Sequence, residues 1–308
     1  MAFLYLLENI RMPVLNEIML AVTTLGEETA FLVIGLVFFW CVDKKKGYFI
    51  MTVGFFGTII TQILKLSFRI PRPWVLDPDF SILEQAREAA AGYSFPSGHT
   101  QTAVGTFGSI AVSTQKKWAQ AICVILALMV AFSRMYIGVH TPADVLVGAL
   151  CALIFVFTLR KPVLLGDLKQ MKVTLACLSA FALLFFLYVH LWDFPNDMDI
   201  HNMESGLKNA YTMIGCTAGI AVVYVADKNW LNFPVDAKWW MQIIKVAAGL
   251  LLVLAVKEGL RAPLEALLPV YPARALRYFL IVMAAGILWP ATFKYLSKIG
   301  DNNELRND

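Results

Sequence analysis

Long apolar segments alternate with short polar joints along most of the chain. Nine of these segments are long and apolar enough to predict helices that cross the hydrocarbon core of a bilayer. The predicted spans are residues 28–42, 48–66, 100–115, 119–135, 141–159, 173–191, 207–225, 240–258 and 275–296. The apolar positions are contiguous and do not alternate, which disfavours a transmembrane β-barrel.

The first 25 residues follow a different pattern, because Glu8, Arg11 and Glu17 interrupt their apolar positions. This predicts an amphipathic segment that lies at the membrane interface or packs against the helix bundle. A tenth, irregular span is the alternative. The charges and Pro13 also disfavour a cleaved signal peptide.

Lysine and arginine gather in every second joint between the predicted spans. The basic joints are 43–47, 115–118, 160–172, 226–239 and the C-terminal tail, whereas 67–99, 136–140, 192–206 and 259–274 lie on the other side. The 192–206 joint contains no lysine or arginine. By the positive-inside rule, the basic joints are cytoplasmic, which predicts an outer N-terminus and an inner C-terminus.

The composition agrees with this organisation. Of 308 residues, 59% are hydrophobic and 16% are charged, with a mean hydropathy of +0.66. Soluble proteins carry about 25% charged residues, so the chain is predicted to be an all-α polytopic membrane protein. Disordered, collagen-like and disulfide-stapled classes are excluded. The net charge of +4 lies in the joints and indicates no nucleic-acid patch. Five cysteines without a CxxC spacing are expected to be reduced, packed thiols.

Three polar patches stand at predicted helix ends, all on the outer side. They are residues 65–73, 95–100 and 133–144. In the first patch, Lys65, Arg69 and Arg72 crowd one helix end on the side where topology requires no basic residues. This concentration of positive charge indicates that an anion is held there.

The residue types in these patches suit a phosphate group. Lys65, Arg72 and Arg134 come from the ends of different spans and could enclose one oxyanion, since arginine offers a bidentate fork and lysine a compact charge. Ser97 and Gly98 precede a predicted helix, whose free N–H groups and positive dipole end would face the same anion. The absence of a side chain at Gly98 permits close backbone approach.

Two histidines supply the candidate reactive groups. Asp144 follows His140 by four residues at the start of a helix, so its carboxylate can fix one ring nitrogen and present the other as a nucleophile. His99 can protonate the leaving oxygen and later activate water. Two histidines and one aspartate form a poor zinc or magnesium set, so neither a metal nor another cofactor is expected.

Each patch also has a structural alternative. Lys65 and Arg72 could extend along the membrane interface, Pro96-Ser97-Gly98 could be an ordinary helix entry, and His140 with Asp144 could be a helix cap. Their joint occurrence at helix ends on one face of the membrane favours a functional site.

The three patches resemble the signatures of the type 2 phosphatidic acid phosphatase superfamily, whose patterns are Lys-x6-Arg-Pro, Pro-Ser-Gly-His and Ser-Arg-x5-His-x3-Asp. The matching residues are Lys65, Arg72, Pro73, Pro96, Ser97, Gly98, His99, Ser133, Arg134, His140 and Asp144. The resemblance covers residues 28–160. It implies a metal-free phosphohistidine mechanism in which His140 is the nucleophile, Asp144 orients it and His99 is the acid and base. The implied phosphate ligands are Lys65, Arg72, Ser97, Gly98 and Arg134.

Two regions are predicted: a catalytic core at 1–165 and additional transmembrane helices at 166–308. The layout of nine spans with an outer N-terminus resembles that of glucose-6-phosphatase and the sphingosine-1-phosphate phosphatases. Lys245 lies inside a predicted span and is therefore a functional candidate by position, although a salt-bridged structural role is favoured.

The leading hypothesis is an integral-membrane lipid phosphatase. Its expected substrates are a polyprenyl pyrophosphate, a lipid of the phosphatidic acid type or a sphingoid-base phosphate. A lipid phosphotransferase of the same fold is one alternative, and a transporter, favoured only by Lys245, is another. The predicted location is a bacterial plasma membrane with the site on the outer face, and the absence of an Asn-x-Ser/Thr acceptor is consistent with it.

Overall fold

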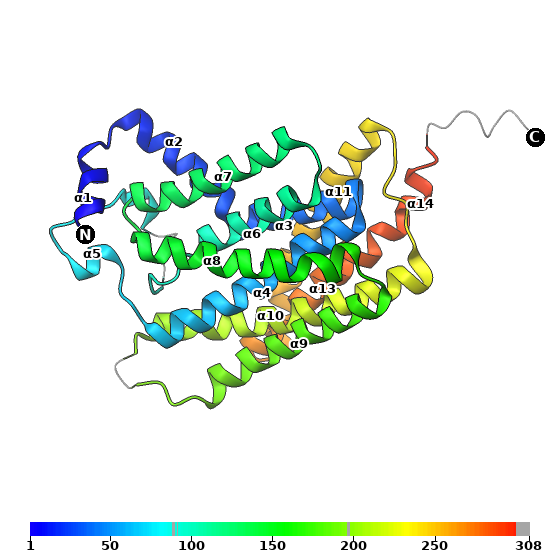
Figure 1. The fold of residues 1–308 in the computed structure, drawn as a ribbon. Helices are drawn as coiled ribbons and strands as arrows, with labels where there is room; N and C mark the ends of the chain where they lie inside the picture. Colours follow the sequence, from blue (N-terminus) through cyan, green and yellow to red (C-terminus); the bar gives the residue numbers. More distant parts are fainter. Residues whose placement is uncertain (88–89, 91, 196–197, 300–308) are drawn as a thin grey trace, which may run out of the picture. The chain divides into compact units, whose positions relative to one another are not determined.

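The computed structural model describes residues 1–87, 90, 92–195 and 198–299. Helices make up nearly all regular structure in these residues, and they contain no strand (Figure 1). The predicted all-α membrane fold is therefore confirmed.

The helices follow one another along the chain with short connections. They are α1 (Ala2–Asn9), α2 (Pro13–Thr23), α3 (Glu28–Val37), α4 (Lys44–Phe68), α5 (Pro73–Leu76), α6 (Gly98–Ser113), α7 (Lys117–Tyr136), α8 (Pro142–Leu159), α9 (Leu168–Leu191), α10 (Ile200–Ala226), α11 (Trp239–Gly259), α12 (Arg261–Leu267), α13 (Val270–Met283) and α14 (Phe293–Leu296). Wider π turns extend several of them, among them η5 (Arg160–Leu165) after α8. A short 3-10 turn, η1 (Thr24–Gly26), joins α2 to the α3 segment.

Seven helical segments among the described residues are long and apolar enough to cross a membrane. They are Lys44–Leu76, Lys117–Tyr136, Pro142–Leu165, Leu168–Leu191, Ile200–Leu231, Trp239–Leu267 and Val270–Leu296. The segments Pro13–Gly26 and Glu28–Val42 meet at a bend of 56° and could form an eighth, broken span. The prediction of nine spans is not confirmed.

The difference in span number has two sources. α6 has 16 residues, a length of about 24 Å, which is shorter than a hydrocarbon core of about 30 Å. Several polar side chains of α6 are buried, because the helix packs between α7 and α8. In addition, the expected first span at 28–42 is one half of the bent pair.

The N-terminal segment packs against the bundle. α2 lies along α7, where the Asn16 side chain accepts a hydrogen bond from the Tyr136 hydroxyl at 2.8 Å. Arg11 donates to the Tyr136 carbonyl at 3.0 Å. After α2, the η1 turn brings Gly26 against the backbone of His99. This arrangement corresponds to the packed alternative that the sequence left open.

The chain forms two compact units. The first contains residues 1–34 and 49–210, and the second contains residues 35–48 and the chain from Tyr211 onward. All the predicted catalytic and phosphate-binding residues belong to the first unit. The predicted boundary at residue 165 stays a prediction.

Lys245 in α11 of the second unit is fully buried. Its ammonium donates to the carbonyls of Val235 at 2.9 Å and Pro234 at 3.4 Å, and it lies 4.3 Å from the centre of the Phe293 ring. No carboxylate of the described residues pairs with it. Lys245 therefore has a structural role, but carbonyls and an aromatic ring replace the expected salt bridge. Lys245 was the feature that favoured a transporter, and these packing contacts account for it.

A buried ion pair between Lys44 and Asp227 stabilises the second unit. The two charges are 2.7 Å apart, and the Asp227 side chain is 1% exposed. We predict that Asp227→Ala destabilises the protein by about 2–3 kcal/mol, because it leaves Lys44 largely buried without its partner. Thermal unfolding in detergent measures the effect.

Glu204→Ala is the control, because Glu204 pairs with Lys208 at 3.0 Å where both side chains are exposed. An exposed pair contributes about 0–1 kcal/mol. Equal melting temperatures for the two variants would show that the Lys44–Asp227 pair contributes no more to stability than an exposed ion pair.

Candidate active site

The three polar patches lie at one end of four helices of the first unit. Lys65 is in the last turn of α4, and Arg134 is in the last turn of α7. The left-handed backbone of Arg69, with φ of +52°, ends α4 and starts the loop that carries Arg72. Ser97 begins α6, and Asp144 is in the first turn of α8. The predicted site residues therefore all lie at or next to helix ends.

His140 and Asp144 are both buried, with their side chains 1% and 3% exposed. Nδ1 of His140 is 3.5 Å from Oδ2 of Asp144. The same carboxylate oxygen accepts a hydrogen bond from the Ser94 hydroxyl at 2.6 Å. Ser94 Oγ is also 3.4 Å from Nδ1 of His140, so one side of the imidazole faces this serine and aspartate.

Asp144 also caps the helix that it begins. Its carboxylate accepts the N–H of Thr141 at 2.7 Å, and its own N–H donates to the Thr141 hydroxyl at 3.3 Å. These reciprocal bonds form a capping box. The cap and the contact with His140 coexist, and the helix start thereby fixes the carboxylate that faces the imidazole.

Arg72 faces the other nitrogen of the His140 ring. Its Nη1 is 2.9 Å from Nε2 of His140 and donates to the Val139 carbonyl at 3.0 Å. The same Nη1 is 3.5 Å from Nδ1, so the guanidinium lies beside the ring near both nitrogens and closer to Nε2.

There is free space beside the first backbone N–H groups of α6. Ser97 is the N-cap, and its Oγ accepts hydrogen bonds from the N–H and hydroxyl of Thr100. A side chain added at Gly98 would meet no atom nearer than Thr61, at 4.0 Å. The ring of His99 makes no hydrogen bond within the described residues. An anion could therefore approach the helix N-terminus beside the His99 ring.

Two further cations complete the cluster. The Arg134 guanidinium is buried and donates from Nη1 to the Thr23 hydroxyl at 2.7 Å, while its Nε has no hydrogen-bond partner. Lys65 donates to the carbonyl of Tyr93. A buried guanidinium N–H without a partner is unfavourable, so Nε is a ready donor for a bound oxyanion.

The surroundings of His140 favour its neutral form. Burial, followed by the charges of Arg72, Arg134 and Lys65, holds the pKa of His140 well below its ordinary value of 6.5. The charge of His99 acts in the same direction. A neutral ring keeps the lone pair that a nucleophile requires.

The structure brings together all the residues predicted to act on a phosphate, and it adds two that sequence reasoning missed. Ser94 bridges Asp144 and His140, and Thr23 holds Arg134. No motif identified either residue, because each reaches the site from an irregular loop or from the N-terminal segment. Within the described residues, no three His, Cys, Asp or Glu side chains are grouped as metal ligands.

The fold and the site define a class: a helical membrane protein with buried cations and two histidines at one end of its helices. Residues 45–163 match the PAP2 superfamily, and residues 211–301 match the transmembrane extension of PAP2 superfamily phosphatases. The chain belongs to the PAP2 superfamily and is a membrane phosphatase. This agrees with the resemblance expected from the three patches.

Curated relatives align with the first part of the chain. A phosphatidylglycerophosphatase B of Bacillus subtilis is 32% identical over 49% of this chain and 76% of its own length. An undecaprenyl-diphosphatase of the same organism is 31% identical over 37% of this chain and 56% of its own length. Human sphingosine-1-phosphate phosphatase 2 is 28% identical over 44% of this chain and 34% of its own length. No solved structure matches the chain.

We predict that Ser94→Ala lowers kcat about 10- to 100-fold with little change in KM. The substitution removes a hydrogen bond to the buried Asp144 carboxylate and loosens His140, while leaving the cationic residues in place. Steady-state assays of the purified protein measure both constants. Ser94→Thr, which retains the hydroxyl, should recover part of the activity.

Ser113→Ala is the matched control, because Ser113 lies at the far end of α6 and donates only to the Ser109 carbonyl. If Ser94→Ala and Ser113→Ala have equal kcat values, Ser94 does not position the site.

Proposed function

We propose that this protein is an integral-membrane lipid phosphatase that removes a phosphate monoester or a terminal pyrophosphate group from an amphiphilic lipid. The observation that carries the proposal is the buried ring of His140, which has the Asp144 carboxylate 3.5 Å from Nδ1 and the Arg72 guanidinium 2.9 Å from Nε2. This arrangement suits a nucleophile that attacks an anionic phosphorus centre.

Binding of the substrate uses the excess of positive charge. The site gathers three cations, Lys65, Arg72 and Arg134. Lys65 and Arg72 lie near one buried carboxylate, Asp144, and the half-buried Glu27 lies near Arg134. A phosphate dianion supplies the missing negative charge. Its oxygens would accept hydrogen bonds from the cations, from Ser97 and from the N–H of Gly98 at the start of α6.

In the first chemical step, Nε2 of His140 attacks phosphorus and the bond from phosphorus to the lipid oxygen breaks. Burial and the charges of Arg134, Arg72 and Lys65 lower the pKa of His99 to about 2, so the negative charge of the bound phosphate must raise that pKa for the ring to enter the step protonated. Protonated His99 then gives its proton to the leaving oxygen, and the products are a phosphohistidine and the dephosphorylated lipid. Asp144 stabilises the positive charge that develops on the His140 ring. Before substrate binds, the Arg72 guanidinium lies 2.9 Å from Nε2 of His140. It turns to a phosphate oxygen as the phosphate enters.

In the second step, a water molecule attacks the phosphohistidine. His99, now neutral, accepts a proton from that water, and the bond between phosphorus and Nε2 breaks. Inorganic phosphate leaves, His140 returns to its neutral form and His99 is again protonated. The cycle requires one neutral and one protonated imidazole, and it requires no metal ion.

Two observations support the proposed substrate class: the position of the site residues at helix ends and the substrates named for the relatives. The named relatives act on phosphatidylglycerophosphate, undecaprenyl diphosphate and sphingosine 1-phosphate, and all three compounds place a phosphate at the end of an apolar chain. The site residues lie at helix ends, where a lipid headgroup meets the membrane boundary. Parallel assays of a polyprenyl pyrophosphate, a phosphatidic acid type lipid and a sphingoid-base phosphate would identify the preferred substrate.

We also propose that the site faces the outer side of a bacterial plasma membrane. The opposite ends of the site helices carry the basic joints at 43–47, 115–118 and 160–172. The positive-inside rule assigns those ends to the cytoplasm.

We predict that the purified protein releases phosphate from lipid phosphates in EDTA, that vanadate blocks this release, and that His140→Ala abolishes it. Vanadate takes the geometry of the phosphoryl transition state, and alanine removes the nucleophile. His190→Ala, on the exposed end of α9, is the control and should retain activity. Full activity of His140→Ala would contradict the mechanism, and transfer of phosphate to an added acceptor lipid would indicate a phosphotransferase.

The low pKa of His140 has a consequence for the pH profile. The ring stays neutral as the pH falls through 6.5, so the acid limb of kcat/KM should lie below the ordinary histidine value. The comparison needs correction for the substrate phosphate, whose second pKa is about 6. An acid limb at or above pH 6.5 after this correction would contradict a depressed pKa for the nucleophile.

A further inference from the structure

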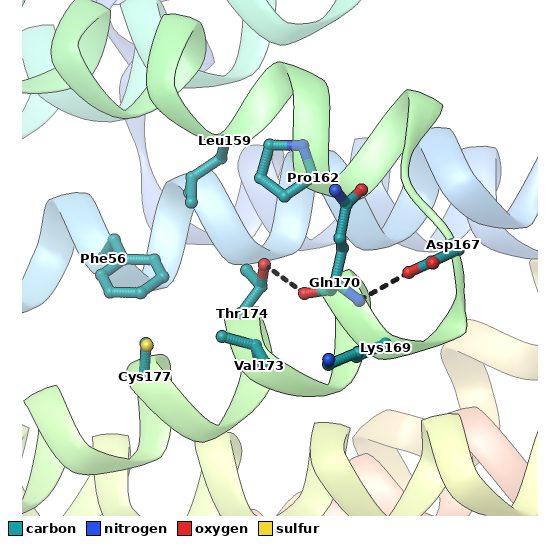
Figure 2. A pocket seen from close by; sticks show the side chains of 9 residues that line it. All are labelled: Phe56, Leu159, Pro162, Asp167, Lys169, Gln170, Val173, Thr174 and Cys177. Atoms are coloured by element: carbon teal, nitrogen blue, oxygen red, sulfur yellow. Dashed lines mark hydrogen bonds between the residues drawn. The ribbon is translucent and has the colours of Figure 1, made fainter.

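A pocket of about 510 Å³ lies in the first unit, away from the catalytic residues. Figure 2 shows side chains from α4, from the end of α8 with η5, and from α9 around it. Its volume is within the range of small-molecule sites. The lining residues are Phe56, Leu159, Pro162, Asp167, Lys169, Gln170, Val173, Thr174 and Cys177.

The pocket is apolar at one end and polar at the other. Phe56, from the middle of α4, closes the apolar end, and its ring stacks on Phe155 at 5.2 Å. Lys169, in the first turn of α9, stands at the polar end. From Lys169 to Cys177 the pocket extends about 12 Å along α9. This gradient parallels the change from headgroup to hydrocarbon in a membrane lipid.

Basic residues are frequent in the chain segments that form the polar end. Lys169 lines the pocket, whereas Arg160, Lys161 and Lys172 are exposed at neighbouring positions of the chain. None of the four forms an ion pair within the described residues. The carboxylate of Asp167 accepts the N–H of Gln170 at 2.8 Å and thereby caps α9 (Figure 2). The surface around the pocket mouth therefore complements an anionic group.

The pocket and the candidate active site occupy opposite ends of α8. Asp144 is in the first turn of that helix, and Leu159 is its last residue. Fifteen residues separate them, which corresponds to about 22 Å along the axis. A lipid in this pocket would therefore belong to the opposite membrane leaflet from the proposed substrate.

We propose that this pocket binds one anionic phospholipid of the leaflet opposite the active site. An acyl chain lies over Phe56, Leu159, Val173 and Cys177, and the phosphodiester lies near Lys169, which lines the pocket. Lys172, three residues further along α9, is exposed beside the lining face and adds positive charge there. Cys177 was expected to be a packed thiol, but it is exposed here and forms part of the apolar floor. The inference is independent of the phosphatase reaction.

Native mass spectrometry of the full-length protein in detergent tests this proposal with phosphatidylglycerol as the probe. This lipid has a phosphodiester and no terminal phosphate, but it is also the product expected from a phosphatidylglycerophosphate substrate, so the pocket is identified by the variants and not by binding alone. We expect the double variant Lys169→Gln/Lys172→Gln to bind the first phosphatidylglycerol about 25-fold more weakly, at roughly 5-fold for each lysine. Phosphatidylcholine should bind both proteins weakly.

Two matched variants separate the pocket from general surface charge. Lys116→Gln/Lys117→Gln removes the same charge at the α6–α7 joint, which is on the same side of the bundle, and should bind the lipid as the unsubstituted protein does. Cys177→Trp fills the apolar end without changing charge and should remove one bound lipid. Equal weakening in both double variants, unchanged binding in Cys177→Trp, or equal binding of phosphatidylcholine would each overturn the proposal.

Discussion

The Asp144 carboxylate is the group on which the candidate site depends. It accepts hydrogen bonds from Thr141 and Ser94 and faces the ring of His140, while its own backbone carbonyl accepts the N–H of Ser97. These contacts join the start of α8, the loop before α6 and the first turn of α6. The orientation of the imidazole is therefore set by backbone groups at two helix starts, which move little once the helices have packed.

The same arrangement makes the site unfavourable until an anion binds. Arg72 and Arg134 are almost fully buried, and Nε of Arg134 has no hydrogen-bond partner. Burying cations without sufficient counter-charge costs free energy, which packing elsewhere in the first unit must offset. In the proposed reaction, a bound phosphate would restore the balance of charge and accept the N–H of Arg134 Nε.

Local patterns made part of this structure predictable from sequence. Asp144 lies in the first turn of α8 and His140 lies just before that helix, and the basic residues at helix ends stand out within an apolar chain. Ser94 and Thr23 could not be predicted, because their contacts depend on how an irregular loop and a bent N-terminal segment fold onto the bundle. The predicted number of spans was not confirmed, in part because hydropathy does not show that α6 is a short, partly polar helix enclosed by its neighbours.

The two ends of α8 differ in chemistry because the residues around them differ in burial. Its first turn lies among cations that are buried and held by hydrogen bonds, which suits the geometric control that catalysis requires. Its last turn leads into η5 and exposed basic residues on long, mobile side chains. Such residues recognise charge without fixed geometry, which suits a lipid headgroup but not a reacting phosphorus atom. One helix can thus contribute to a reaction in one leaflet and to lipid binding in the other, because burial differs at its two ends.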